Sequence, residues 1–252
     1  MFCELEKKSI IKITGQDALV FLQGLITNDI KKASKDTLIY ALMLTPQGKF
    51  LYDFFIQKIE DGYLLEIPKT YQEEIVKKLN FYKLKAKVEI SQSPLKVFVI
   101  WENISLGLKD PRGVFSRLYS QEFPKDAKGS YEEYNLLRIQ NTVISGEEDL
   151  ISGQSFPLQF NMNEMNAIDY LKGCYVGQEV TARSHHRGKV KKQIKTIISD
   201  GIFEEKLPLT QKNVEIGQIT SFEKNFALAQ INIEDLKQEE KIFCGKNQVK
   251  FF

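Results

Sequence analysis

Residues 172–188 have the sequence KGCYVGQEVTARSHHRG, the most specific chemical signal in the chain. Gly173 and Gly177 flank Cys174, and glycine allows the tight or left-handed backbone that brings a main chain close to a ligand. Lys172 lies beside the cysteine, and a neighbouring lysine favours the reactive thiolate form. The alternative is that Cys174 is a small buried hydrophobic residue, as most free cysteines are.

Length and composition are those of a folded globular protein. The chain has 252 residues, enough for one large domain or two modest ones, and 42% are hydrophobic against 27% charged. A net charge of +2 is far below that of a dedicated nucleic-acid-binding protein, so any basic surface is local. Cys3, Cys174 and Cys244 are scattered without metal-ligand spacing, which favours a reducing compartment and no metal site. Without a signal-peptide core or a membrane-spanning apolar run, we expect a cytoplasmic protein. We also expect it to be a monomer.

Strand-like and helix-like patterns alternate through the first two thirds of the chain and predict an α+β fold. Apolar residues at helical spacing predict helices at residues 16–25, 70–84 and 130–142. Apolar and aromatic runs predict strands at residues 10–13, 38–44, 50–57, 63–67, 86–90 and 95–101. The turn TPQGK at residues 45–49 predicts a hairpin between two of them.

The character of the sequence changes from residue 188 onward. Short strand-like runs separated by turns occupy residues 190–198, 215–222, 225–232 and 248–252, with a helical segment at 233–237. This pattern predicts a small β-barrel or sandwich. We therefore expect an α+β region over residues 1–187 and a β domain over 188–252.

The motif at residues 172–188 resembles the signature of the YgfZ/GcvT-like folate-binding family, relatives of the glycine-cleavage T-protein. Similar segments occur in the family's order elsewhere: TGQDA at 14–18, FLQGL at 21–25, TND at 27–29, LTPQGK at 44–49 and IGQITS at 216–221. The resemblance implies two intertwined α+β units followed by a small C-terminal β-barrel. It also implies a tetrahydrofolate-binding protein that assists iron–sulfur cluster assembly or repair, and thereby tRNA modification, with Cys174 as the functional residue.

Asp53 is a candidate pterin ligand. Alternation along residues 50–56 places one set of side chains on each face of the strand: Phe50, Tyr52 and Phe54 on one, Leu51, Asp53 and Phe55 on the other. A carboxylate on an apolar face needs a partner, and the amino-pyrimidine edge of a pterin offers paired N–H donors. The T-protein relatives carry an Asp at the corresponding place of the folate site. The alternative is an Asp in water or paired with Lys or Arg.

Six further residues are candidates for cofactor binding. Asn28 follows the first predicted helix, where Asn commonly closes a turn, and Gln47 and Lys49 lie in the hairpin turn, which can present polar groups to a ligand. The motif itself adds Lys172, Tyr175 and Gln178, and the ring of Tyr175 is a candidate to stack on a pterin.

Arg138 and Gln140 lie in LRIQ, residues 137–140, which resembles the L-R-x-E of the T-protein, where the acid contacts the pterin. We take both as cofactor-binding candidates. An amide can donate and accept hydrogen bonds, but it cannot act as a carboxylate base, so Gln140 argues against aminomethyl transfer. Glu147 and Glu148 follow closely, and we interpret them as a solvated acidic turn.

One dense basic cluster stands out in this nearly neutral chain: Arg183, His185, His186, Arg187, Lys189, Lys191, Lys192 and Lys195. In a strand the adjacent histidines would point to opposite faces, and no third ligand completes a metal site. Three interpretations stay open, namely a solvated strand face, capture of folate's anionic glutamate tail by groups such as Arg183 and Arg187, and contact with RNA phosphates. The cluster lies next to the Cys174 motif, which favours capture of the glutamate tail.

The leading hypothesis is a tetrahydrofolate-dependent factor for iron–sulfur cluster assembly whose partners are assembly proteins or client enzymes. A single thiol cannot hold a cluster that normally takes four ligands, so cluster storage within a monomer is disfavoured. One alternative is a folate-dependent one-carbon transferase. The other is an RNA-binding accessory protein, although direct tRNA contact is not favoured.

Overall fold

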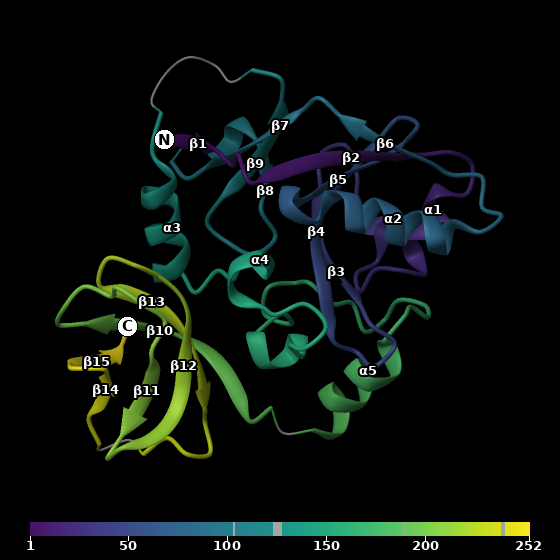
Figure 1. Cartoon of the computed structure of the whole chain (residues 1–252). Helices are drawn as coiled ribbons and strands as arrows, with labels where there is room; N and C mark the ends of the chain where they lie inside the picture. Colours follow the sequence, from purple (N-terminus) through teal and green to yellow (C-terminus); the bar gives the residue numbers. More distant parts are fainter. Residues whose placement is uncertain (103, 123–127, 189, 238–239) are drawn as a thin grey trace.

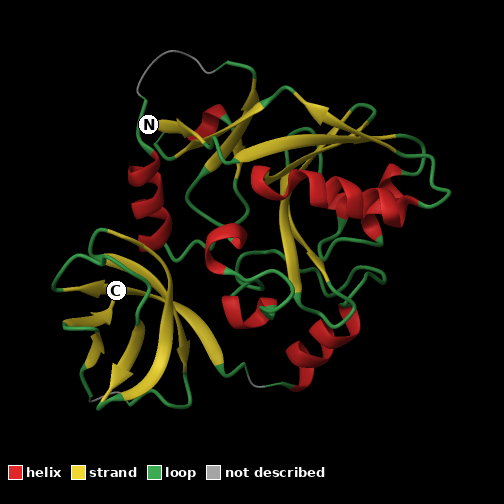
Figure 2. Cartoon of the chain, viewed as in Figure 1, coloured by secondary structure: helices red, strands yellow, loops and turns green. Residues whose placement is uncertain are grey.

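The chain folds into an N-terminal part with two antiparallel sheets and a C-terminal β-barrel (Figure 1). The structure is a computed structural model that describes residues 1–102, 104–122, 128–188, 190–237 and 240–252. Short helices flank the sheets, as Figure 2 shows. The predicted α+β fold with a β-barrel at the C-terminal end is confirmed.

The first sheet has five antiparallel strands. In spatial order they are β3 (Leu38–Leu44), β4 (Phe50–Ile59), β5 (Gly62–Pro68), β2 (Lys8–Thr14) and β6 (Glu89–Ser93). Helices α1 (Ala18–Gln23) and α2 (Gln72–Lys83) cover one face, because their apolar stripes, which include Phe21 and Ile75, share a core with the strands. Two 3₁₀ turns, η1 (Ile30–Lys32) and η2 (Lys69–Tyr71), border these helices.

The second sheet has four antiparallel strands. In spatial order they are β1 (Phe2–Glu4), β7 (Lys96–Ile100), β9 (Ser116–Ser120) and β8 (Leu108–Lys109), the last preceded by η3 (Ile104–Leu106). Helix α3 (Tyr131–Gln140) packs Tyr134 into the core below this sheet. Since β1 pairs with β7 while the intervening strands build the first sheet, the two units are intertwined as expected.

The C-terminal strands close into a six-stranded barrel. In spatial order they are β10 (Lys192–Ser199), β13 (Phe226–Asn232), β12 (Val214–Glu223), β11 (Pro208–Gln211), β14 (Ile242–Cys244) and β15 (Asn247–Phe251). Closure leaves no free sheet edge, and the interior is a separate apolar core. The division of the chain at residue 187 stays a prediction; α5 (Gln178–Arg187) ends there and β10 begins five residues later.

Two predictions of helix or strand differ from the structure. Residues 178–187 are helical, although we expected the basic cluster to lie on a strand. Most of α5 is solvent-exposed, so its sequence lacks the apolar repeat that signals a helix. Residues 233–237 form a turn and its extension, not a helical segment.

A β-bulge in the first hairpin changes the face of Phe50. The register of the β3–β4 pair shifts between Met43 and Leu44. Phe50 therefore shares a core with Phe55, whereas we expected it beside Tyr52. From residue 52 onward the predicted alternation holds.

Buried charges join the two sheets. The guanidinium of Arg117 on β9 lies 2.6 Å from Glu66 on β5 and 3.3 Å from Asp110. Arg112 bridges to the same Asp110 at 2.9 Å. Burial opposes ionisation of Asp110, but the two arginines outweigh it and lower the pKa of that carboxyl.

We expect Arg117→Leu to lower the free energy of unfolding by about 3–5 kcal/mol, because it leaves Glu66 buried without its counter-charge. Urea denaturation measures this loss. The control is Lys96→Ala, which removes an exposed bridge to Glu4 and should cost less than about 1 kcal/mol. Losses of equal size in the two variants would contradict the importance of the buried bridge.

Candidate functional site

Cys174 lies on the loop that leads into helix α5, and it is exposed. The other two cysteines, Cys3 and Cys244, are buried. Burial raises the pKa of the Cys3 thiol to about 12, so Cys3 stays protonated at neutral pH. The interpretation of Cys174 as a buried hydrophobic residue is therefore wrong, and the chain presents an accessible thiol at this position.

Lys172 fastens the start of this loop. Its ammonium donates to the carbonyl oxygens of Gln23 at 2.8 Å and Ile26 at 2.5 Å, at the C-terminal end of α1. The same nitrogen lies 4.9 Å from the centre of the Tyr175 ring. Burial lowers the pKa of Lys172 to about 8. The side chain thus holds the loop against α1 instead of extending toward a ligand.

The other end of the loop packs on the hairpin turn of residues 45–49. Gly177 has a φ of +86°, and a Cβ at this position would lie 2.6 Å from the carbonyl oxygen of Thr45. Gly48, with a φ of +74°, leaves room for Val180, whose Cβ would be 3.0 Å from an added Cβ. Two segments that are distant in the sequence and resemble the same family therefore lie against each other.

The other pocket candidates in these two segments have different surroundings. Tyr175 is buried in a core cluster, so its ring is not free to stack on a ligand here. The ammonium of Lys49 lies 5.9 Å from the centre of the Phe156 ring, Gln47 is exposed at the turn, and Gln178 begins α5. Gln47 and Lys49 belong to the hairpin turn that packs against the end of the Cys174 loop, and a role of these residues in pterin binding stays a prediction.

The basic cluster is divided between α5 and the barrel. Arg183 pairs with Glu179 one helical turn earlier, at 2.8 Å, and Lys191 pairs with Glu234 at 3.0 Å. Both pairs are solvent-exposed, so they contribute little to stability and leave the charges accessible. The prediction of a single strand face is wrong because the cluster begins on a helix.

Aromatic contacts occupy the end of α5. The His185 ring stacks on Tyr170 with centroids 3.8 Å apart and planes 14° apart, and His186 meets the same ring edge-on. Lys189 lies outside the described residues, and only the backbone of Arg187 is described. The proposed grip of these residues on a folate tail stays a prediction.

Asp53 is buried, as predicted, on the apolar face of β4. Its Oδ2 accepts a hydrogen bond from the Tyr40 hydroxyl at 2.9 Å and one from the Gly146 N–H at 3.3 Å. Its Oδ1 has no hydrogen-bond partner among the described residues. The carboxylate therefore keeps one free acceptor in a place where an unpaired oxygen is costly.

The recess beside Asp53 is too small for a pterin in this conformation. Its volume is about 10 Å³, and Tyr52, Tyr71 and Leu150 are among the residues that line it. That is room for about one water molecule, whereas ligand sites usually exceed about 300 Å³. The covering element is α4 (Gly146–Asp149), since a Cβ on Gly146 would lie 2.5 Å from Asp53 Cγ.

The side chain of Asn28 makes hydrogen bonds within the protein. Its Nδ2 donates to the carbonyl oxygens of Tyr40 and Asn166, both at 2.8 Å, and its Oδ1 accepts from the N–H of Asp29. Both donors and the carbonyl oxygen are engaged. The turn-closing alternative accounts for this residue, and a pocket role does not.

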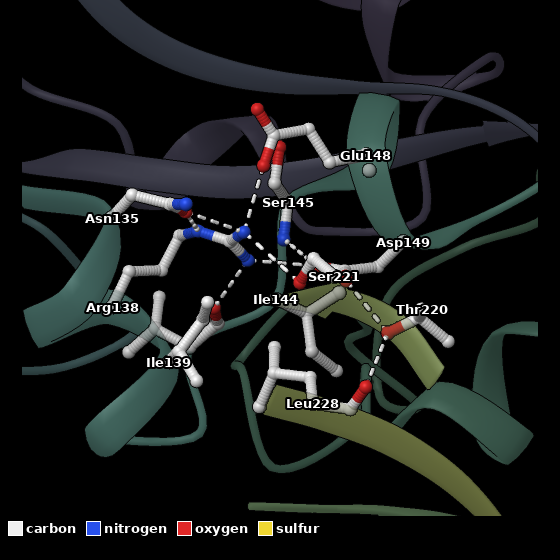
Figure 3. Close-up of polar contacts among 12 residues, drawn as sticks. Asn135, Arg138, Ile139, Ile144, Ser145, Glu148, Asp149, Thr220, Ser221 and Leu228 are labelled. Carbon is white, nitrogen blue, oxygen red and sulfur yellow. Dashed lines mark hydrogen bonds and ion pairs between the residues drawn. The ribbon is translucent and has the colours of Figure 1, made fainter. Parts of the chain in front are cut away.

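Arg138 is buried where α3, α4 and the barrel meet (Figure 3). Its guanidinium donates to Asp149 at 2.8 Å, to Glu148 at 2.7 Å and to Ser221 of β12 at 3.1 Å. Burial opposes the charge, but the two carboxylates outweigh it and raise the pKa of Arg138. Arg138 thus links three parts of the fold, while Gln140, half-buried, ends α3.

Sequence reasoning missed the partners of Arg138. Asp149 is 5% exposed, and its Oδ1 accepts from the hydroxyl of Thr220 at 2.7 Å. The interpretation of residues 147–148 as a solvated acidic turn is wrong, because Glu148 neutralises the buried guanidinium. One signal for these partners is present in the sequence: Arg138 occupies an apolar position of a predicted helix. A buried arginine requires acidic partners.

The described part of the chain has neither a cluster of metal-ligating side chains nor a membrane-spanning helix. No group of three or more His, Cys, Asp and Glu side chains there could hold a metal ion. No helix there is long and apolar enough to cross a membrane.

Relatives with similar sequences are named iron–sulfur cluster assembly factors. The chain is 33% identical over 218 residues to the iron–sulfur cluster assembly factor IBA57 homolog of Mycosarcoma maydis, covering 74% of this chain and 54% of that protein. It is 29% identical to the mouse factor and 28% identical to the human factor, covering 70% and 78% of them. All three are described as mitochondrial. The chain thus spans only about half the length of the fungal relative.

A domain match and a solved structure agree with the fold. Residues 2–101 match the GCVT N-terminal domain. The glycine cleavage system aminomethyltransferase T of Bartonella henselae has the same fold, with a TM-score of 0.75 over 98% of this chain and 83% of that one, at 12% identity. The domain match thus covers the first part of the chain, and the chain as a whole has the GcvT-like fold.

Proposed function

We propose that this protein is an iron–sulfur cluster assembly factor of the YgfZ type and that Cys174 is its functional thiol. The observation that carries the proposal is an exposed thiol on a loop fastened at both ends, by Lys172 to α1 and by Gly177 to the hairpin turn. A fastened loop loses little conformational entropy when a partner binds. The names of the fungal, mouse and human relatives support the same role.

The thiol needs ligands from a second molecule. An iron–sulfur cluster usually takes four ligands, and the other two cysteines of this chain are buried. Cys174 would therefore act on a cluster that a partner carries, either an assembly protein or a client enzyme. Client enzymes that modify tRNA would connect the protein to tRNA modification without direct RNA contact.

We expect Cys174→Ser to lose activity in a cluster-maturation assay while keeping the melting temperature of the natural chain, because the exposed thiol contributes little to packing. Iodoacetamide applied to the folded protein should modify Cys174 and spare Cys3 and Cys244, as mass spectrometry would show. Val20→Ser, at an exposed position of α1, is the control. Full activity of Cys174→Ser would remove the thiol from the proposed function.

The ammonium of Lys172 gives the loop a measurable pH dependence. Its pKa in the folded protein is about 8, below the usual 10.5, so between these values the unfolded chain binds more protons. The contribution of Lys172 to the free energy of unfolding should therefore rise with pH from about 8 to about 10.

We expect Lys172→Met to remove this rise. The measurement is the difference in the free energy of unfolding between the natural chain and the variant, obtained from urea titrations at pH 7.5 and at pH 9.5. The exposed Lys195→Met is the control. A difference that does not change with pH would show that Lys172 is not held as a buried ammonium.

Tetrahydrofolate binding is a second candidate function. The free Oδ1 of Asp53 favours it, because a buried carboxylate oxygen without a partner is suited to an N–H donor of a ligand. The GcvT-like fold supports it by analogy. In the conformation described here the recess does not admit the pterin, so binding requires α4 to move. Gln140 in place of an acid still argues against aminomethyl transfer.

We expect Asp53→Ala to weaken tetrahydrofolate binding about tenfold or more, since it removes the acceptor for a charge-assisted hydrogen bond. Equilibrium titration under anaerobic, reducing conditions measures this change, with a tRNA fragment as competitor at two salt concentrations. Asp61→Ala, an exposed carboxylate paired with Lys12, is the matched control. Equal affinities for the natural chain and Asp53→Ala would exclude Asp53 from the site.

A further inference from the structure

Helix α4 separates two cavities. On one side is the small recess beside Asp53, and on the other a cavity of about 470 Å³ between β1, the start of α3 and residues 145–148. Glu147 lines both. The larger cavity alone is within the size range of small-molecule sites.

The contacts of Glu147 hold α4 in place between the two cavities. Its carboxylate accepts from Lys8 at 3.2 Å and from the hydroxyl of Thr70 at 3.4 Å. The Lys8–Glu147 pair is only about 15% exposed, so the pair is partly shielded from water. Gly146, one residue earlier, packs directly on the Asp53 carboxylate.

Movement of α4 would join the two spaces. Because Gly146 and Glu147 form the wall between them, a shift of these residues would uncover the free Oδ1 of Asp53 at the inner end. The joined space would then be large enough for a bicyclic ligand. The other end of α4 is anchored through Asp149 to Arg138 and Thr220, so the Gly146 end is the part that moves.

The larger cavity combines aromatic and basic side chains. Its walls include Leu5 and the rings of Tyr131 and Tyr134, which suit a flat apolar group. Lys7 and Lys128 also line it, and the ammonium of Lys7 lies 5.6 Å from the centre of the Tyr131 ring. A ligand with N–H donors at one end, a flat ring system and an anionic tail at the other would match this arrangement.

We propose that the cavity beside β1 and α3 is the outer chamber of the Asp53 site, that Glu147 is the latch of a gate formed by α4, and that Lys7 and Lys128 receive the anionic tail of the ligand. The proposal rests on the second candidate function, tetrahydrofolate binding. Lys7 and Lys128 then bind the anionic tail in place of the basic cluster of α5 and β10. Opening the gate costs free energy, so the protein binds its ligand less tightly than a protein with the gate already open.

The latch is tested with a ligand that lacks the tail. Glu147→Gln keeps the size of the side chain but removes the ion pair with Lys8, so a tail-free tetrahydropterin should bind about threefold tighter or more. Thr70→Val removes the second contact of the latch and should act in the same direction. The melting temperature of each variant checks that it is folded.

The tail site is tested by comparing folates with one and with several glutamates. The double variant Lys7→Ser/Lys128→Ser should reduce the preference for polyglutamate about tenfold and leave tetrahydropterin binding unchanged. Lys192→Ser/Lys195→Ser on the barrel is the matched control and should change neither.

The outcomes separate the gate from the folate site. Folate binding that depends on Asp53 but is unchanged in the Glu147 and Lys7/Lys128 variants would overturn the gate and the outer chamber and leave the Asp53 site in place. Loss of polyglutamate preference in the Lys192/Lys195 variant instead would return the tail to the barrel. If the natural chain and Glu147→Gln both fail to bind any pterin, the folate site and this proposal are both wrong, whereas the role of Cys174 is judged by its own assay.

Discussion

The buried guanidinium of Arg138 is the constraint on which the arrangement of the domains depends. A fixed positive charge in the interior is tolerated only when acids and hydrogen-bond acceptors surround it. Asp149 and Glu148 supply the negative charge from α4, and Ser221 supplies an oxygen from the barrel. Because these groups come from separate segments, the charge is satisfied only when α3, α4 and the barrel are docked together (Figure 3).

The position of α4 determines the state of the Asp53 carboxylate. With Asp149 held between Arg138 and Thr220, the first residue of α4, Gly146, reaches Asp53 and donates its N–H to it. Only glycine fits there, since a side chain would overlap the carboxylate. The ion pair between Arg138 and Asp149 therefore also positions Gly146, the residue that covers the Asp53 carboxylate.

The sequence predicts local features well where one physical cause dominates. Alternation in residues 50–56 places Asp53 on a buried face, and the spacing of Phe21 and Ile75 predicts the two helices on the first sheet. It cannot predict the bulge at Leu44, because a register shift depends on the whole hairpin. The ion pair of Glu148 is equally hidden, since its partner is a guanidinium ten residues earlier that only the tertiary fold brings close.

The β3–β4 hairpin connects the two candidate sites. Asp53 is on its second strand, and its turn supplies the carbonyl oxygen of Thr45 against which Gly177 packs. The close approach at Gly177 leaves no space for the Cys174 loop to shift toward the turn without moving the strand. A ligand that displaces α4 and changes the packing on Asp53 would therefore act on the same hairpin that positions the thiol. Coupling of this kind needs no long pathway, because a single rigid element touches both sites.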